Sequence, residues 1–286
     1  MTKKRRPPAA HQGQSRTAIT GKDPLAKLPI RKASRRGGYG WLRDLPDARD
    51  FAYAAPLDHF PQGLPPSIDM RSACPPVYNQ GQLGSCTANG IAGAIEFDQG
   101  KLGNQEFTPS RLFIYYNERV IEGTVNQDSG AQVRDGIKSV VTLGAPPETD
   151  WPYVITKFAK RPPPLAYSDA KSDLVSSYAR VTQNLAQMQG CLADGYPFVF
   201  GFTVYQSFES QAVASSGVVP MPAPGEATVG GHCVLAVGYN NTTRTFIIRN
   251  SWGTSWGMKG YCTMPYEYLL DAQLASDFWT IRSVTG

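Results

Sequence analysis

Residues 79–97 read NQGQLGSCTANGIAGAIEF, a glycine-rich turn that leads into a run of helical character. Cys86 stands at that junction, directly after Ser85. A lone cysteine is most often a buried packing residue. At a helix start, however, unpaired backbone N–H groups and the positive dipole end stabilise a thiolate, which is the attacking species. Cys86 is therefore a candidate nucleophile, and Gly81 and Gly84 would let the backbone approach a bound carbonyl.

The composition is that of a globular protein. The chain has 286 residues, of which 41% are hydrophobic and 18% charged, enough for one large core or two modest ones. No window reaches the run of about 18 apolar residues that a membrane span needs, and the basic residues 1–8 are followed by polar sequence. We expect no membrane span and no conventional signal peptide. The expected location is cytoplasmic by default, with leaderless export left open.

The cysteines stand at positions 74, 86, 191, 233 and 262. This odd set contains no CxxC pair and no metal-ligand spacing, which argues against a disulfide framework and against a zinc site. We therefore expect reduced thiols, no metal and no cofactor.

The charge is divided unevenly along the chain. Residues 1–43 hold 12 Lys and Arg against one Asp, whereas the remaining residues hold 16 basic and 22 acidic side chains. A tail this rich in Lys, Arg, Pro and Gly cannot bury enough surface to fold alone. Three interpretations stay open: a solvated tail, a segment that binds nucleic acid or another polyanion, and a segment that docks on the acidic body.

The pattern along the chain predicts an extension and one domain in two halves. Residues 1–63 carry seven of the 23 prolines and no long helical period, so they read as an N-terminal extension. Residues 64–286 form the expected domain, mostly helical over about 64–171 and strand-rich over about 172–286. The prediction is an α+β protein with a cleft between its halves. Expected helices follow Ser85 and Thr108-Pro109 and cover about 131–143 and 182–194; expected strands are 198–205, 232–239, 245–250 and 260–264.

A thiolate nucleophile needs a base, and the chain has three histidines. His11 lies in the tail and His59 in the extension, which leaves His232. If the strands on either side of Asn241 form a hairpin centred on that residue, His232 faces Asn250 across the ladder. An amide there would fix the imidazole tautomer, so that the other ring nitrogen faces the cysteine.

Taken singly, each of these residues has an ordinary structural explanation. His232 could be a core histidine with its hydrogen bonds satisfied, and Asn250 could simply end a strand. Together with Cys86 they supply nucleophile, base and orienting group, the combination that covalent catalysis requires.

Several segments resemble the papain-like cysteine proteases. Residues 64–71 are similar to the start of the mature family domain, 77–81 to its oxyanion-hole segment and 84–86 to its nucleophile segment. Residues 250–257 are nearly the string that follows the family's catalytic asparagine, and Gly260-Tyr261 continues it. The resemblance covers about residues 64–286 and implies the papain-like fold of two subdomains.

The resemblance implies a role for each matching residue. Cys86 would attack the scissile carbonyl, His232 would transfer the proton and Asn250 would orient His232. Gln80 and the backbone N–H of Cys86 would form the oxyanion hole. Trp252 would shield the His–Asn hydrogen bond from water, a role compatible with simple core packing.

The resemblance also implies substrate-binding residues. Ser129 and Gly130 match the glycine-bearing edge along which an extended substrate pairs, although Gly130 could equally be a plain turn glycine. Cys233 would line the pocket for the substrate side chain two residues before the cut.

The sequence departs from the family pattern in places. Leu83 stands where a cysteine is common, Thr87 stands where an aromatic residue is common, and the family's disulfides have no counterparts. The long helical propeptide of eukaryotic members is missing, and residues 39–50 instead resemble bacterial relatives. We expect residues 1 to about 40 to cover part of the cleft, as in a zymogen.

The expected function is that of a cysteine endopeptidase acting on peptides or proteins through an acyl-enzyme. Two alternatives remain at this point. One is a thiol acyltransferase or amidase on the same fold. The other is an inactive papain-like binding module whose tail grips a polyanion.

Overall fold

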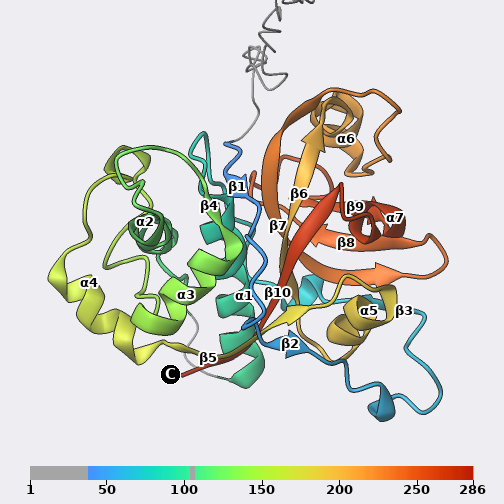
Figure 1. The fold of residues 1–286 in the computed structure, drawn as a ribbon, viewed down its shortest axis with the longest axis horizontal. Coiled ribbons are helices and arrows are strands. Elements are labelled where there is room, and N and C mark those ends of the chain that lie inside the picture. Colours follow the sequence, from blue (N-terminus) through green and yellow to red (C-terminus); the bar gives the residue numbers. More distant parts are fainter. Residues whose placement is uncertain (1–37, 104–106, 286) are drawn as a thin grey trace, which may run out of the picture. The chain divides into compact units, whose positions relative to one another are not determined.

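The computed structural model describes residues 38–103 and 107–285, which belong to one compact unit, Arg35–Gly286. Its architecture confirms the expected α+β fold: in Figure 1 the helices α2, α3 and α4 lie on one side, and most of the largely antiparallel sheet lies on the other together with α5, α6 and α7. The division into an extension and a domain at residues 63 and 64 stays a prediction. In the described part of the chain no helix is both long and apolar enough to cross a membrane.

The sheet connects most of the strands in the order β2-β5-β10-β6-β7-β8-β9, with β3 paired to β7 and a separate parallel pair β1-β4. The helices are α1 Cys86–Leu102, α2 Arg111–Glu122, α3 Val133–Leu143, α4 Pro164–Asp169, α5 Leu185–Ala193, α6 Gln211–Ser216 and α7 Tyr266–Leu270. The strands are β1 Trp41–Leu42, β2 Ala52–Tyr53, β3 Ser67–Asp69, β4 Ala131–Gln132, β5 Val175–Val181, β6 Phe198–Tyr205, β7 Thr228–Asn240, β8 Thr245–Arg249, β9 Tyr261–Pro265 and β10 Ala275–Val284.

Helix α1 lies at the centre of the molecule. It is buried on almost every side, from Cys86 to Gln99, and it packs against β7 and β10. Such a helix needs apolar or small residues all round, which the alanines and glycines of its sequence provide. It ends at Gly103, whose φ of 71° gives the left-handed cap that glycine favours. The helix therefore holds its first residue firmly at the boundary between the two halves.

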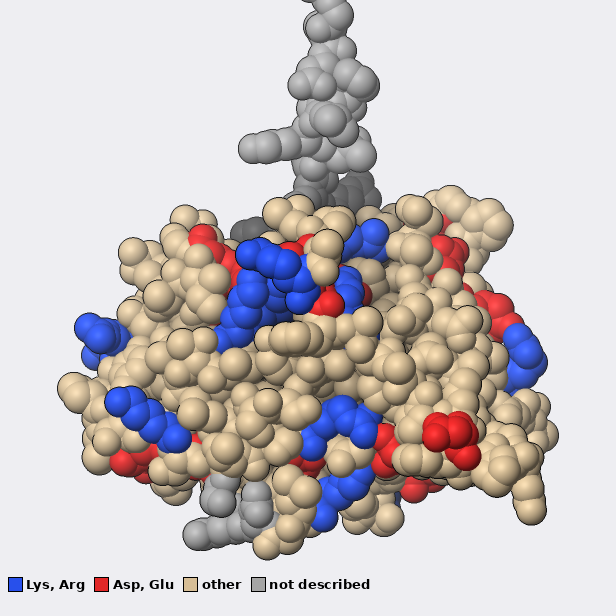
Figure 2. Space-filling view, turned by 60° about the horizontal axis from the view of Figure 1, so that its bottom comes forward, with Lys and Arg blue, Asp and Glu red and all other residues tan. Residues whose placement is uncertain are grey.

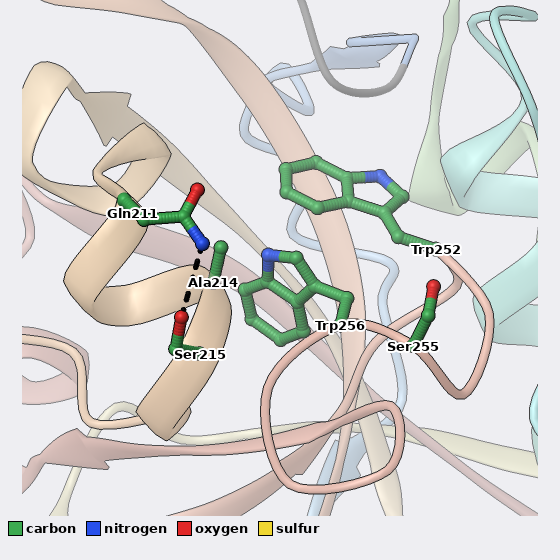
Figure 3. A pocket seen from close by; sticks show the side chains of 6 residues that line it. All are labelled: Gln211, Ala214, Ser215, Trp252, Ser255 and Trp256. Carbon is green, nitrogen blue, oxygen red and sulfur yellow. Dashed lines mark hydrogen bonds between the residues drawn. The ribbon is translucent and has the colours of Figure 1, made fainter.

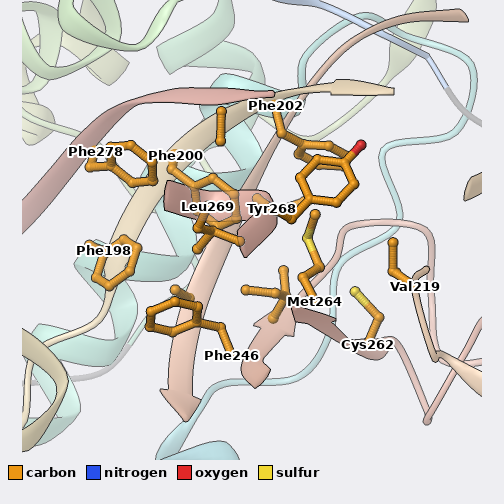
Figure 4. Close-up of a cluster of buried hydrophobic side chains, with 14 of the residues drawn as sticks. Phe198, Phe200, Phe202, Val219, Phe246, Cys262, Met264, Tyr268, Leu269 and Phe278 are labelled. Carbon is orange, nitrogen blue, oxygen red and sulfur yellow. The ribbon is translucent and has the colours of Figure 1, made fainter. Parts of the chain in front are cut away.

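The core of the β half is aromatic (Figure 4). Phe198, Phe200 and Phe202 alternate along β6 and face one side of the sheet, as the two-residue period of a strand requires. Phe200 stacks on Phe278 of β10 with ring centroids 5.5 Å apart. Because these rings fill one face, Gly201 of the same strand is left on the other.

An arginine–aspartate network fastens residues 44–50 to the body. Arg180 on β5 binds Asp44 at 3.3 Å, Asp50 at 3.1 Å and Asp277 at 2.9 Å. Arg134 on α3 binds Asp50 at 2.6 Å. The segment that follows β1 is therefore held by charges from both halves of the fold. On the face drawn in Figure 2, basic and acidic side chains are interspersed in a mostly uncharged surface.

Two details of the predicted elements are wrong. The symmetric hairpin about Asn241 would pair Leu235 with residue 247, whereas Leu235 faces Arg249. The turn between β7 and β8 has four residues, 241–244, so the hairpin is centred between Thr242 and Thr243 and not on Asn241. An extra residue of β7 between Ala236 and Gly238 shifts the register once more. Helix α2 is capped by Ser110, whose hydroxyl accepts from Phe113 N, and not by Thr108-Pro109.

Candidate active site

Cys86 is the first residue of α1 and is fully buried. Burial raises the pKa of its thiol to about 12, against backbone hydrogen bonds from Cys233, Gly40 and Thr87 that lower it. The sulfur thus already has three N–H groups aimed at it, as a thiolate would need. With water excluded, however, the neutral thiol is the favoured form.

His232 on β7 is joined to Asn250, which directly follows β8. The ring atom Nε2 lies 2.8 Å from Asn250 Oδ1. An amide oxygen can only accept, so Nε2 carries the proton and Nδ1 is left as the acceptor. Within the described residues Nδ1 has no hydrogen-bond partner. Burial lowers the pKa of His232 to about 4, although the bond to Asn250 raises it, so the ring is neutral in the closed site.

Trp252 covers the imidazole. Its ring lies 4.9 Å from the His232 ring, centroid to centroid, at an interplanar angle of 30°. Phe202 and Phe208 approach the imidazole from other directions, at 5.7 and 6.4 Å. Three aromatic rings thus pack around the imidazole, and the shielding role of Trp252 stays a prediction.

Gln80 is fixed at both ends of its side-chain amide. Its oxygen accepts a 2.6 Å hydrogen bond from Ser251 Oγ. Its Nε2 donates to Gly38 O at 2.8 Å and to Leu83 O at 2.9 Å. The amide therefore presents its N–H group to a carbonyl oxygen supplied by the segment upstream of β1.

We call residues 38–42 the cover segment, which crosses the site and includes β1 at its end. In Figure 1, β1 lies between the two halves. Gly40 O accepts from Ala131 N at 2.7 Å, and β1 runs parallel to β4 beside it. A side chain on Gly130, whose φ is 75°, would place Cβ only 2.0 Å from Gly40 O. Gly130 is thus a glycine both for its conformation and for this backbone approach.

Two side chains of the cover segment pack against the β half. The ring of Tyr39 lies edge-on to His232 at 5.9 Å and to Trp252 at 6.0 Å, and its hydroxyl donates to the carboxylate of Glu209. Trp41 is buried against Gly201 of β6 and Gly231 of β7.

Comparison with known proteins gives the family. Residues 64–277 match the family model described as papain family cysteine protease. The chain belongs to this family. It is 48% identical over 216 residues to an uncharacterised peptidase C1-like protein of Acanthamoeba polyphaga mimivirus, covering 72% of this chain and 70% of that one. It is 29% identical over 211 residues to cysteine proteinase 3 of Entamoeba histolytica, covering 70% of this chain and 62% of that one. The relatives agree in indicating a peptide hydrolase.

Solved structures show the same fold. Xylellain, a cysteine protease from Xylella fastidiosa, superposes with a TM-score of 0.82 at 45% identity and covers 87% of this chain and 97% of its own. Digestive procathepsin L 3 of Tenebrio molitor superposes with a TM-score of 0.64 at 18% identity over 87% of this chain and 76% of its own, which supports the fold alone. A bacterial origin stays a prediction, because the viral relative is as similar as xylellain.

This papain-family chain brings most of the predicted site residues around the cover segment. Cys86, Gln80, Gly130, His232 and Trp252 all have contacts with it, and Asn250 stands behind His232.

The other two predicted substrate-binding residues are engaged elsewhere. The hydroxyl of Ser129 donates within its own loop, to Thr124 Oγ1 at 2.9 Å and to Gly130 O at 3.1 Å. The side chain of Cys233 is buried towards α1, where a Cβ on Gly90 would lie 3.5 Å from its sulfur. Their binding roles stay predictions.

Sequence reasoning missed several residues of the site. Ser251, which orients Gln80, directly follows Asn250, so its position in the motif was a usable signal. Glu209 and Asp277 bind Tyr39 and Trp41 of the cover segment, but both come from stretches without a recognisable motif.

The unusual Thr87 is also explained by a buried partner. Its hydroxyl donates to Glu118 Oε1 at 2.7 Å, and both residues are fully buried. Burial raises the pKa of Glu118 well above its ordinary value, so this carboxyl is neutral. A threonine–glutamate pair thus fills the space under the nucleophile where family members commonly have an aromatic ring.

A pocket of about 310 Å³ borders Trp252 (Figure 3). The indoles of Trp252 and Trp256 form one wall, 5.4 Å apart and nearly perpendicular. Gln211 and Ser215 of α6 form the other, joined by a 3.1 Å hydrogen bond. The pocket therefore offers aromatic faces and amide or hydroxyl groups beside the covered site.

Proposed function

We propose that this chain is a cysteine endopeptidase that cleaves peptide bonds through a Cys86 thiolate and an acyl-enzyme. The observation that carries the proposal is the 2.8 Å contact between His232 Nε2 and Asn250 Oδ1, which leaves Nδ1 as a proton acceptor. An imidazole held in this tautomer can take the thiol proton and later return it to the leaving amine.

The reaction follows from these positions. The thiol proton passes to His232 Nδ1, and the sulfur attacks the scissile carbonyl carbon. The resulting oxyanion accepts from Gln80 Nε2 and from the backbone N–H of Cys86. His232 then protonates the leaving amine as the C–N bond breaks, and a water molecule hydrolyses the thioester with His232 as the base. Ser251 keeps the Gln80 amide in the donating orientation.

The cover segment is proposed to restrict the cleft, as in a zymogen. The carbonyl of Gly38 lies on Gln80 Nε2, where the oxyanion of a substrate would accept. Gly40 offers its N–H to the sulfur, and an N–H group cannot be attacked. Both contacts support a segment that fills the site without being cleaved. Residues 1–37, with most of the basic tail, lie outside the described residues, so their docking and any binding of polyanions stay predictions.

The test is hydrolysis of a fluorogenic peptide library by wild type, Cys86→Ala and the matched control Cys262→Ala. Cys262 is an equally buried cysteine on β9, away from the proposed dyad. We expect Cys86→Ala to lower kcat/KM by at least about 1000-fold and Cys262→Ala to keep most of the activity. Undiminished activity of Cys86→Ala would rule the proposal out. Adding amines to the assay separates hydrolysis from acyl transfer, because a transferase would form the corresponding amides.

A further inference from the structure

Trp41 of the cover segment sits in a cradle made by two glycines. A Cβ on Gly201 of β6 would lie 1.9 Å from Trp41 Cε2, and a Cβ on Gly231 of β7 would lie 2.8 Å from Trp41 Cε3. Gly201 and Gly231 are neighbours across the β6–β7 ladder, since Gly201 pairs with Cys233 and Thr203 with Gly231. The missing side chains therefore leave a flat recess whose size matches an indole ring.

The floor of the cradle carries a carboxylate. Trp41 Nε1 donates to Asp277 Oδ2 at 3.1 Å, and Asp277 is 2% exposed. The same oxygen accepts from the backbone N–H of Asp44 at 2.9 Å, while Arg180 binds the other oxygen at 2.9 Å. Asp277 thus keeps a charge partner and one further donor when the indole is absent, but it loses one hydrogen bond.

The cradle lies one residue away from Cys86 along the cover segment. The N–H group of Gly40 meets the Cys86 sulfur, and Trp41 is the next residue. The backbone of Trp41 pairs with Ala131, directly after Gly130. An extended chain that pairs along this edge as the cover segment does, with one residue at Cys86, has the side chain of the adjacent residue at the mouth of the cradle.

We infer that Gly201, Gly231 and Asp277 form a specificity pocket that prefers a substrate side chain with a flat aromatic ring and a neutral N–H donor, namely tryptophan. The inference rests on the proposed peptidase function and deepens it. The recess takes the ring, and Asp277 takes the N–H. By the family resemblance, this side chain is the one two residues before the cut.

The chemistry of the floor separates tryptophan from its competitors. Phenylalanine fills part of the recess but offers no N–H group. Asp277 Oδ2 then keeps the backbone N–H of Asp44 and loses the indole donor, which costs binding energy. Arginine or lysine brings a second cation next to Arg180, and neither side chain has the aromatic ring that the recess between Gly201 and Gly231 holds. The indole satisfies both the shape and the hydrogen bond without adding charge.

The experiment uses the full-length Trp41→Ala protein, which vacates the cradle, and a matched substrate pair. One fluorogenic peptide carries tryptophan two residues before the cut, and the other carries 3-benzothienylalanine, in which sulfur replaces the N–H. We expect kcat/KM to be about 10- to 100-fold lower for the benzothienyl substrate. Equal kcat/KM for the two substrates would overturn the inference. Gly40→Ala, which displaces the same segment by overlap with Gly84, supplies a second open form.

Two further measurements complete the test. Adding Gly201→Ala to the open protein should remove the preference for tryptophan, because the new Cβ occupies the recess. In full-length Trp41→Ala/Cys86→Ala, indole should raise the Tm more than benzothiophene does. If indole stabilises this double variant while Trp41→Ala with its Cys86 intact turns over no peptide, the cradle is supported and the proposed function is refuted. Turnover without discrimination between the paired substrates would refute the cradle alone.

Discussion

Cys86 and His232 are fully buried, and this governs their charge. Burial raises the pKa of the thiol to about 12 and lowers the pKa of the imidazole to about 4. Between these values both side chains are neutral. Forming the thiolate–imidazolium pair therefore requires solvent or substrate to enter, so that access to the cleft and activation of the nucleophile are coupled.

The coupling predicts a pH dependence of opening. His232 has a pKa of about 4 in the closed site against an ordinary value of 6.5. As the pH falls below 6.5, an open site takes up a proton that the closed site does not, so the closed form is progressively disfavoured until about pH 4. Above pH 6.5 this effect is absent, because forming the thiolate–imidazolium pair in the open site only moves the Cys86 proton to His232 and takes up no proton from solution.

The measurement is the rate of Cys86 alkylation by iodoacetamide between pH 7.5 and 4.5, in wild type and in Trp41→Ala. The ratio of the wild-type rate to the Trp41→Ala rate should rise as the pH falls, because only the wild type has a cover to open. A constant ratio over this range would show that closing the site does not change the pKa of His232.

At the scale of elements, the cover segment depends on glycines that allow backbones to touch. A Cβ on Gly40 would lie 1.7 Å from the carbonyl oxygen of Gly84, in the turn before α1. Neither backbone can move without disturbing the start of α1 or the β1–β4 pair. Alanine at this position should therefore displace the cover segment rather than be accommodated.

Gly40→Ala should raise kcat/KM for small peptide substrates by about tenfold or more, which corresponds to a shift of about 1.4 kcal/mol towards the open form. Gly63→Ala is the control, since its Cβ has nothing within 4 Å, so that the strain from its φ of 85° arises without overlap with the cover segment. Steady-state kinetics with one dipeptide substrate compares the three proteins. Lower activity in Gly40→Ala than in wild type would contradict a covering role.

The sequence predicted elements well where their signal was local. Strand β6 has the predicted bounds, and α1 begins directly after Ser85 as expected. Strands β5 and β10 were not predicted, because their serines and charged residues interrupt the apolar alternation. Their stability comes from pairing between distant segments, which a local pattern does not contain.

The site residues also differ in whether a local sequence signal predicts them. Cys86, His232, Asn250 and Gln80 could be proposed from motifs, whereas Asp277 needed the fold to bring it to Trp41. The His232–Asn250 contact was predicted from a hairpin register that is wrong, because the turn between β7 and β8 has four residues and the hairpin is not centred on Asn241. Asn250 lies just beyond the paired part of β8, so its side chain reaches His232 without facing it in the ladder.

At the scale of the whole molecule, Arg180 joins segments that are far apart in the chain. It binds Asp44 and Asp50 after the cover segment and Asp277 at the start of β10. The carboxylates of Asp44 and Asp277 have side-chain exposures of 0% and 1%. Removing the arginine would leave buried carboxylates without their shared cation.

Arg180→Ala should lower the free energy of unfolding by about 2–4 kcal/mol, somewhat below the range for fully buried pairs because Arg180 is itself 30% exposed. The matched control is Arg244→Ala, whose partner Glu267 is exposed and whose loss should cost less than about 1 kcal/mol. Urea unfolding of the variants and wild type measures the difference. Equal midpoints for the two variants would mean that the network adds no stability.

The cover segment is part of the same polypeptide as the cleft, and this has a consequence for inhibitors. A tethered competitor is present at an effective concentration that dilution of the protein does not change. A substrate analogue aimed at Cys86 therefore competes only for the open molecules, and its apparent Kd equals its intrinsic Kd divided by the open fraction. The inhibitor concentration that halves the activity should be higher for wild type than for Gly40→Ala by one constant factor. That factor should be the same for every cleft-directed compound that requires the cover segment to leave.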